Sequence, residues 1–113
     1  MLQLVTAVVK PHVLDAVREA LQGIGVQGVT VTEVKGFGRQ GGHSETYRGA
    51  EYQIHFVPKV KLEVVAETAD AEKVADAIAR AAGTGKIGDG KIWIVDVGAL
   101  MRIRTGERGN DAL

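Results

Sequence analysis

Residues 2–22, LQLVTAVVKPHVLDAVREALQ, decide the fold, because they join an apolar run to an amphipathic segment. Leu2–Val9 is rich in β-branched residues and predicts a buried strand. Apolar residues recur at helical spacing over Val13–Gln22, which predicts an amphipathic helix that Gly23 ends. The first unit of the fold is therefore a strand followed directly by a helix.

The order strand, helix, strand occurs twice. Val26–Gly36 is rich in Val and Thr and predicts the strand that completes the first unit. Residues 59–64 alternate between charged and apolar side chains, which is the period of a half-buried strand. An amphipathic helix at Ala71–Ala82 and an apolar strand at Ile92–Val97 follow. The repeat predicts a single α+β domain over residues 1–113, built as a ferredoxin-like double βαβ sandwich.

The apolar strands also predict association. Leu2–Val9 and Ile92–Val97 have apolar residues at both odd and even positions, which point to opposite faces of the sheet. Both faces therefore need to be covered. Helices cover one face, and a chain of 113 residues has nothing left for the other. An exposed apolar sheet face is an association site. We therefore expect a homo-oligomer whose sheets pack together.

A long polar loop separates the two units, at about residues 37–55. Structureless loops of this length are uncommon in compact domains and are usually functional or disordered. It has few large apolar residues that could hold it on a core, so we expect it to reach a partner. Its chemically distinctive side chains are Arg39, Gln40, His43, Tyr47, Arg48 and Tyr52.

Composition excludes several classes of protein. The formal net charge is zero, which gives no electrostatic argument for nucleic acid or for an anionic membrane. Cysteine is absent, which excludes disulfides and thiolate metal sites and fits a cytoplasmic protein. No apolar run approaches the length of a membrane span, about 20 residues. Lysines and arginines are nevertheless clustered, which favours a local anionic ligand.

The strongest candidate for an anion site is the turn Thr84–Lys91, TGKIGDGK, with three glycines and two lysines. Glycine lets main-chain N–H groups turn toward an anion, and lysine adds positive charge. The turn is not a Walker A loop, because Ile92 stands in place of a Ser or Thr and the turn leads into a strand. It predicts a phosphate site of another architecture; a plain connecting turn is the alternative.

Two other readings fail. Gly36, Gly38 and Gly41 match a dinucleotide fingerprint, but no helix follows them. An enzyme of the ferredoxin-like class would need a nucleophile or an acid–base pair, and carboxylates such as Glu63 and Asp89 have no evident partner. Catalysis is therefore not expected from these residues.

The sequence closely resembles the PII family of nitrogen-regulatory signal proteins, over essentially all of the chain. The motifs match in order and at the family's spacing. They are Thr30–Gln40 (TVTEVKGFGRQ), His43–Tyr52 (HSETYRGAEY), Val57–Lys61 (VPKVK), Thr84–Lys91 (TGKIGDGK) and Arg102–Glu107 (RIRTGE).

The resemblance implies a homotrimer in which ATP and ADP compete for three clefts between subunits. The turn at about residues 83–91 would contact the phosphates. The C-terminal arginine segment, about residues 102–108, would reach in from the neighbouring subunit, and arginine suits bidentate phosphate contacts. The implied ATP and ADP residues are Thr30, Gly36, Gly38, Arg39, Val65, Gly88, Asp89, Gly90, Lys91, Arg102 and Arg104.

The resemblance also implies 2-oxoglutarate as effector. It would chelate a Mg²⁺ ion held by ATP and by the Gln40 side-chain oxygen, so its binding would require MgATP. Lys59 would pair with its distal carboxylate. The implied effector residues are Gly38, Gln40, Gly41, Lys59 and Gly88. The alternative is a PII-like trimeric sensor of a different small-molecule effector.

The long loop corresponds to the T-loop of the family. Arg48 matches the residue that plugs an ammonium channel, Tyr47 lies beside it, and Tyr52 matches the tyrosine that a nucleotidylyltransferase uridylylates or adenylylates. The implied outputs are ammonium transport, nitrogen-assimilation enzymes and transcription regulators, with membrane contact only through the channel and at most weak ATPase activity. Gly41, His12 and His55 depart from the family's usual residues, which leaves partner choice and loop docking open.

Overall fold

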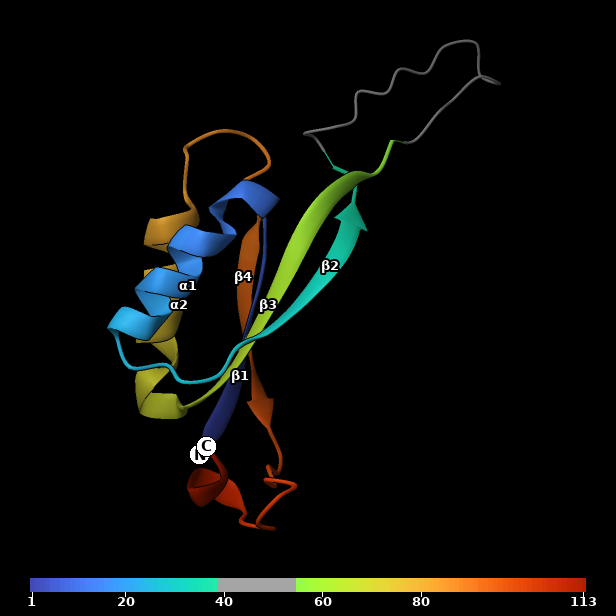
Figure 1. Ribbon diagram of the computed structural model, residues 1–113. Helices are drawn as coiled ribbons and strands as arrows, with labels where there is room; N and C mark the ends of the chain where they lie inside the picture. The colour runs from blue at the N-terminus through green and yellow to red at the C-terminus, as the bar shows by residue number, and fades with distance from the viewer. Residues whose placement is uncertain (39–54) are drawn as a thin grey trace.

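The computed structural model describes residues 1–38 and 55–113, and Figure 1 shows the arrangement of its elements. Two short 3-10 helices, Pro11–Val13 and Gly109–Ala112, accompany the main elements. In chain order these are β1 (Leu2–Val9), α1 (Leu14–Gly23), β2 (Thr30–Gly36), β3 (Val57–Glu67), α2 (Thr68–Ala82) and β4 (Lys91–Val97).

The four strands form one antiparallel sheet in the order β2-β3-β1-β4. Both helices lie on the same side of this sheet (Figure 1). The register places Leu4 of β1 opposite Val65 of β3 and Val95 of β4. The predicted α+β, ferredoxin-like architecture is confirmed.

Several element boundaries differ from the predictions. β2 begins at Thr30 and not at Val26, because the Val26 amide donates a 3.0 Å hydrogen bond to the Leu21 carbonyl and so stays with the end of α1. α1 begins at Leu14, after a 3-10 turn that starts with Pro11. α2 begins at residue 68, three residues before the predicted start at residue 71.

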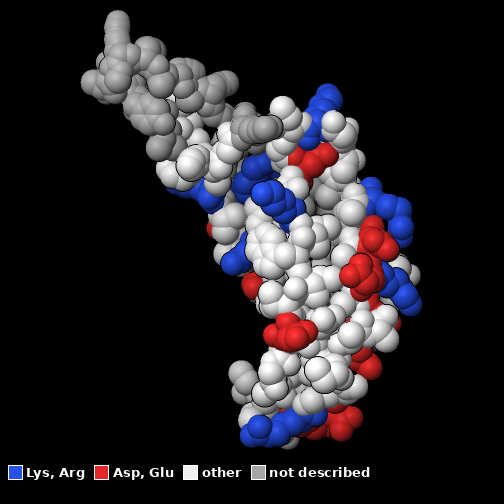
Figure 2. All heavy atoms as spheres, turned by 180° about the vertical axis from the view of Figure 1, so that it is seen from behind, with Lys and Arg blue, Asp and Glu red and all other residues white. Residues whose placement is uncertain are grey.

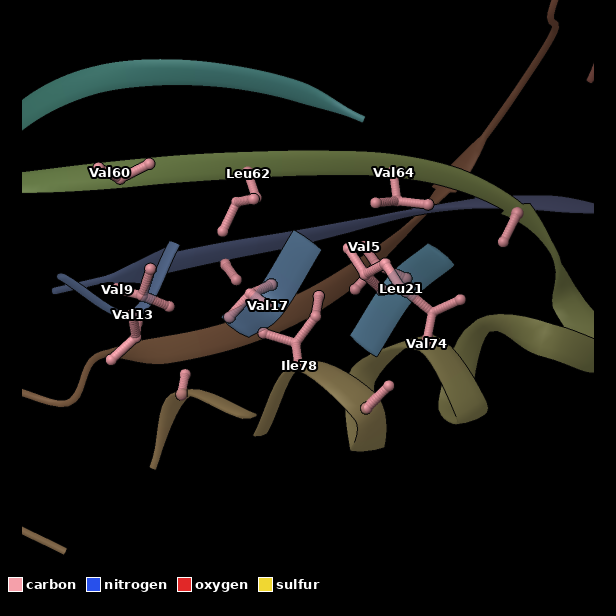
Figure 3. Packing of buried hydrophobic residues seen from close by; sticks show 14 of the residues in the cluster. Val5, Val9, Val13, Val17, Leu21, Val60, Leu62, Val64, Val74 and Ile78 are labelled. Carbon is pink, nitrogen blue, oxygen red and sulfur yellow. The ribbon is translucent and has the colours of Figure 1, made fainter. Parts of the chain in front are cut away.

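The core lies between the helices and one face of the sheet (Figure 3). Val5, Val17, Leu21 and Ile78 are fully buried there, since each is 0% exposed. Val5 comes from β1 and faces the two helices that carry the other three side chains. Alternate residues of β1 and β3 supply the rest of this layer, as the alternation at residues 59–64 predicts.

No helix among the described residues covers the other face of the sheet, and we refer to it as the open face. Trp93 and Val95 of β4 are 45% and 47% exposed, although both are large and apolar. Seen from behind, the molecule shows an uncharged area across its middle, with Lys and Arg atoms above it (Figure 2). The single chain therefore leaves apolar sheet surface uncovered, as predicted from the apolar residues on both faces of its strands.

Candidate functional site

Four of the predicted ligand residues lie on the open face of β2 and β3. The register pairs Thr30 with Glu63 and Gly36 with Val57. Lys59 and Val65 are on the same face of β3 as Val57 and Glu63, because alternate residues of a strand share a face. Lys59 and Val65 are six residues apart on one strand, so they are separated by about 20 Å. The sheet therefore offers a row of positions, with Thr30 and Val65 at one end and Gly36 and Lys59 at the other.

The predicted phosphate turn lies at the Lys59 end of this row, against the end of β1. Gly90 has a φ of +104°, and a Cβ there would lie 1.8 Å from the Val8 carbonyl oxygen. Only glycine allows this approach of two main-chain segments. The same contact brings the glycine turn of the second unit onto the first strand, next to Lys91, which pairs with Val8.

The Asp89 carboxylate organises the turn from within. Its Oδ2 accepts hydrogen bonds of 2.8 Å from the main-chain N–H groups of Thr84 and Gly85, and its Oδ1 accepts one from the Thr84 hydroxyl. Lys10 Nζ lies 3.2 Å from Oδ1. The Thr84 hydroxyl and amide hydrogen bonds, with smaller contributions from Gly85 and Lys10, hold the pKa of Asp89 well below its usual range. Asp89 was predicted among the ATP residues, and its carboxylate faces the groups of its own turn.

Lys59 joins the sheet to this turn. Its Nζ donates a 2.7 Å hydrogen bond to the Gly88 carbonyl oxygen. Burial lowers the pKa of Lys59, and the nearby cation of Lys10 lowers it further, while the Asp89 carboxylate acts in the opposite direction. A partly buried ammonium group near a second cation is a favourable place for an anion.

Two cavities in the described part of the chain contain most of the predicted ligand residues that it covers. One, of about 620 Å³, is lined by Gly36, Gly38, Lys59, Gly88 and Lys91, among others. The other, of about 790 Å³, includes Thr30 and Val65. Both volumes lie in the usual range for small-molecule sites.

Arg102 and Arg104 lie at the other end of the sheet from the turn, in the red C-terminal segment of Figure 1. The Arg102 guanidinium pairs with the Glu107 carboxylate at 2.7 Å and donates a 2.6 Å hydrogen bond to a main-chain oxygen of Leu113. Arg104 is exposed. Within one chain, the structure does not bring these two arginines to the phosphate turn.

The remaining predicted site residues lie outside the described residues. They are Arg39, Gln40, Gly41, Tyr47, Arg48 and Tyr52.

Two features of the site were not predicted from the sequence. Lys10 directly follows the first strand and was assigned no role from the sequence, yet it pairs with Asp89 of the turn. Phe37 and Phe56 contact each other edge to face, with ring centroids 5.6 Å apart, where β2 ends and β3 begins. An aromatic residue at each end of a polar loop is the signal that could have predicted this contact.

The described residues give no indication of a protein-only metal centre, because no three His, Asp or Glu side chains among them gather into a ligand set. Neither α1 nor α2 is long and apolar enough to cross a membrane, and the same holds for every helix described.

Comparisons with known proteins agree with this geometry. The family model described as "Nitrogen regulatory protein P-II" matches residues 2–107. The chain is 60% identical to "Nitrogen regulatory protein P-II" of Rhizobium meliloti over 109 residues, covering 96% of this chain and 97% of that protein. It is 55% identical to "Nitrogen regulatory protein GlnK" of Escherichia coli K12 over 112 residues, covering 99% and 100%. The crystal structure of Arabidopsis thaliana PII bound to citrate superposes with a TM-score of 0.83 at 40% identity, covering 99% of this chain and 92% of the other.

Proposed function

The chain belongs to the nitrogen regulatory protein P-II family, and on that premise we propose that it is a cytoplasmic signal protein that reads ATP, ADP and 2-oxoglutarate. Its relatives are named as regulatory proteins, which supports regulation and not catalysis. The observation that carries the proposal is the contact between Lys59 and Gly88, which joins the effector lysine to the phosphate turn.

The donor set of the turn fits a nucleotide's phosphates. Lys59 and Lys91 line the same cavity as Gly88 and Gly90, so ammonium groups lie beside glycine main chain. Both kinds of group suit phosphate oxygens. Thr30 and Val65 lie about 20 Å along the sheet, beyond the reach of a nucleotide held by the turn of the same chain, and they line a cavity with Leu100 of the C-terminal segment.

The proposed site requires a second copy of the chain. Arg102 and Arg104 are remote from the turn within one chain, whereas the exposed Trp93 and Val95 make the open face suitable for packing against another copy. A homotrimer places the arginine segment of one subunit at the turn of the next. The site then consists of the turn, the open face of β2 and β3, and two arginines supplied by a neighbour.

The effector would bind beside Lys59. Its partly buried ammonium group suits the distal carboxylate of 2-oxoglutarate, and the citrate bound by the Arabidopsis relative is also a polycarboxylate. The Gln40 side-chain oxygen would help to hold a Mg²⁺ ion, which would supply positive charge for the ATP phosphates and for the effector carboxylate. Gly38 and Gly88 line the same cavity as Lys59, which supports their assignment to the effector site.

The loop between β2 and β3 would report the state of the site, because Gln40 lies at its root in the sequence. Its partners would be an ammonium channel, contacted through Tyr47 and Arg48, and nitrogen-assimilation enzymes or regulators. Tyr52 would be the site of uridylylation or adenylylation. The Escherichia coli relative is named a nitrogen regulatory protein, which supports a role in nitrogen regulation.

Mixed trimers test whether the site is shared between subunits. Lys91→Gln and Arg102→Ala each remove one side of the proposed site, so each variant alone binds ATP weakly. Trimers assembled from both variants at equal amounts regain tight binding at about a quarter of the sites, because an intact turn then meets an intact arginine. Failure of the mixture to regain any tight sites contradicts the shared site.

A further inference from the structure

The Lys10 ammonium group, which follows the first strand, lies against the turn of the second unit. Lys10 lies immediately after β1, with extended backbone, and its side chain is 17% exposed. Its Nζ is 3.2 Å from Asp89 Oδ1 and 3.4 Å from the Thr84 hydroxyl oxygen. These contacts join residues that are 74 or more positions apart.

The turn contains an apparent conflict. Asp89 fixes its shape by accepting hydrogen bonds from Thr84 and Gly85, yet a carboxylate repels the phosphates that the turn is proposed to bind. Lys10 is placed to resolve this conflict, because it neutralises Oδ1 and leaves the hydrogen bonds at Oδ2 in place. Lys59 makes its contact with the Gly88 carbonyl instead.

We propose that Lys10 is a positioning residue of the phosphate turn, which it holds and neutralises through Asp89. The inference rests on the proposed nucleotide site and extends it to a residue from a different part of the sequence. Lys10 need not touch the nucleotide. Its contribution grows with the negative charge of the ligand, because the charge it offsets lies beside the phosphates.

Calorimetry with adenosine, ADP and ATP tests this charge dependence in the full-length protein. Lys10→Gln is expected to lower the affinity for ATP about tenfold and the affinity for ADP about threefold, and to leave the affinity for adenosine unchanged. Lys10→Arg keeps the charge and is expected to restore most of the ATP affinity. Lys35→Gln removes the same charge from the helix-side face of β2 and serves as the control.

The outcomes separate this inference from the proposed function. No ATP binding by the unaltered protein overturns the nucleotide site itself. Normal ATP binding by Lys10→Gln, or an equal loss for adenosine and ATP, overturns the role of Lys10 while the site stands.

A measurement without ligand tests the pairing itself. Carboxyl-detected NMR follows the titration of Asp89, whose pKa is expected to rise in Lys10→Gln, because one stabilising partner is removed. An unchanged Asp89 titration would overturn the pairing of Lys10 with Asp89 directly.

Discussion

The Lys59 ammonium group donates a 2.7 Å hydrogen bond to the Gly88 carbonyl oxygen, across 29 positions of the sequence. In the proposed function, Lys59 meets the effector and Gly88 belongs to the phosphate turn. A ligand that engages either group therefore acts on the other. Such a contact provides a physical route for coupling between two ligands, and thermodynamics requires that coupling to be reciprocal.

Replacement of Lys59 tests the effector end of this contact. Lys59→Met is expected to weaken 2-oxoglutarate binding by about 30-fold, because a partly buried carboxylate loses its cationic partner. Lys35→Met removes the same charge from the opposite face of the sheet at the same end, and its effect on affinity is expected to be small. Isothermal titration of the effector in the presence of MgATP measures both. Equal losses in the two variants would mean that only net charge matters.

Gly90 is expected to be the least replaceable glycine of the turn. Gly90→Ala places a Cβ 1.8 Å from the Val8 carbonyl oxygen at a φ of +104°, so the turn has to shift. The expected cost is on the order of 3 kcal/mol of unfolding free energy. Gly23→Ala is the matched control, because a Cβ there meets nothing within 4 Å. Denaturant unfolding compares the two variants, and a Gly90→Ala protein as stable as Gly23→Ala would show that the close approach is absent.

The lowered pKa of Asp89 predicts a contribution to folding stability that is lost in acid. Its folded pKa lies below its ordinary value of 3.8, so the folded state holds the carboxylate more tightly ionised than the unfolded state does. The stabilisation is complete above the ordinary pKa and is lost as the pH falls through it toward the folded value. The stability difference between the unaltered protein and Asp89→Asn is therefore expected to shrink as the pH falls from about 5 to about 2. Thermal unfolding across this range measures it, and a pH-independent difference would contradict the assignment.

Glu107 competes for the arginine that the proposed site needs. It pairs with Arg102 at 2.7 Å within the chain, and the two side chains are 33% and 47% exposed. Because pairs at such exposure contribute little, Glu107→Gln is expected to tighten ATP binding only about two- to fivefold. Glu19→Gln, which removes an exposed carboxylate from α1 on the helix side of the sheet, is the control and is expected to leave ATP affinity unchanged. A loss of ATP affinity in Glu107→Gln would show that the carboxylate positions Arg102 instead of competing for it.

The fold was largely predictable because its signals are local and repeated. The alternation at residues 59–64 predicts both the strand and the face on which Lys59 lies, and the sheet has this arrangement. The start of β2 was wrong because Val26 and Val29 resemble strand residues but pack against the core as separate anchors beside α1. Hydrophobicity alone cannot distinguish these two uses of valine.

The site was less predictable, because its contacts join distant parts of the sequence. The glycines and lysines of Thr84–Lys91 indicate an anion turn, and the turn does meet Lys59. No spacing rule connects Lys10 to Asp89, since β1 and the turn become neighbours only through the sheet. Local sequence patterns likewise do not predict that Arg102 lies far from the turn within one chain.

The most direct test of the central claim is titration calorimetry of 2-oxoglutarate into the purified protein, with MgATP and without it. Effector binding only in the presence of MgATP, weakened by Gln40→Ala and by Lys59→Ala, is the predicted result. ATP binding without any response to 2-oxoglutarate would contradict the nitrogen-sensor function and favour a PII-like trimer with a different effector.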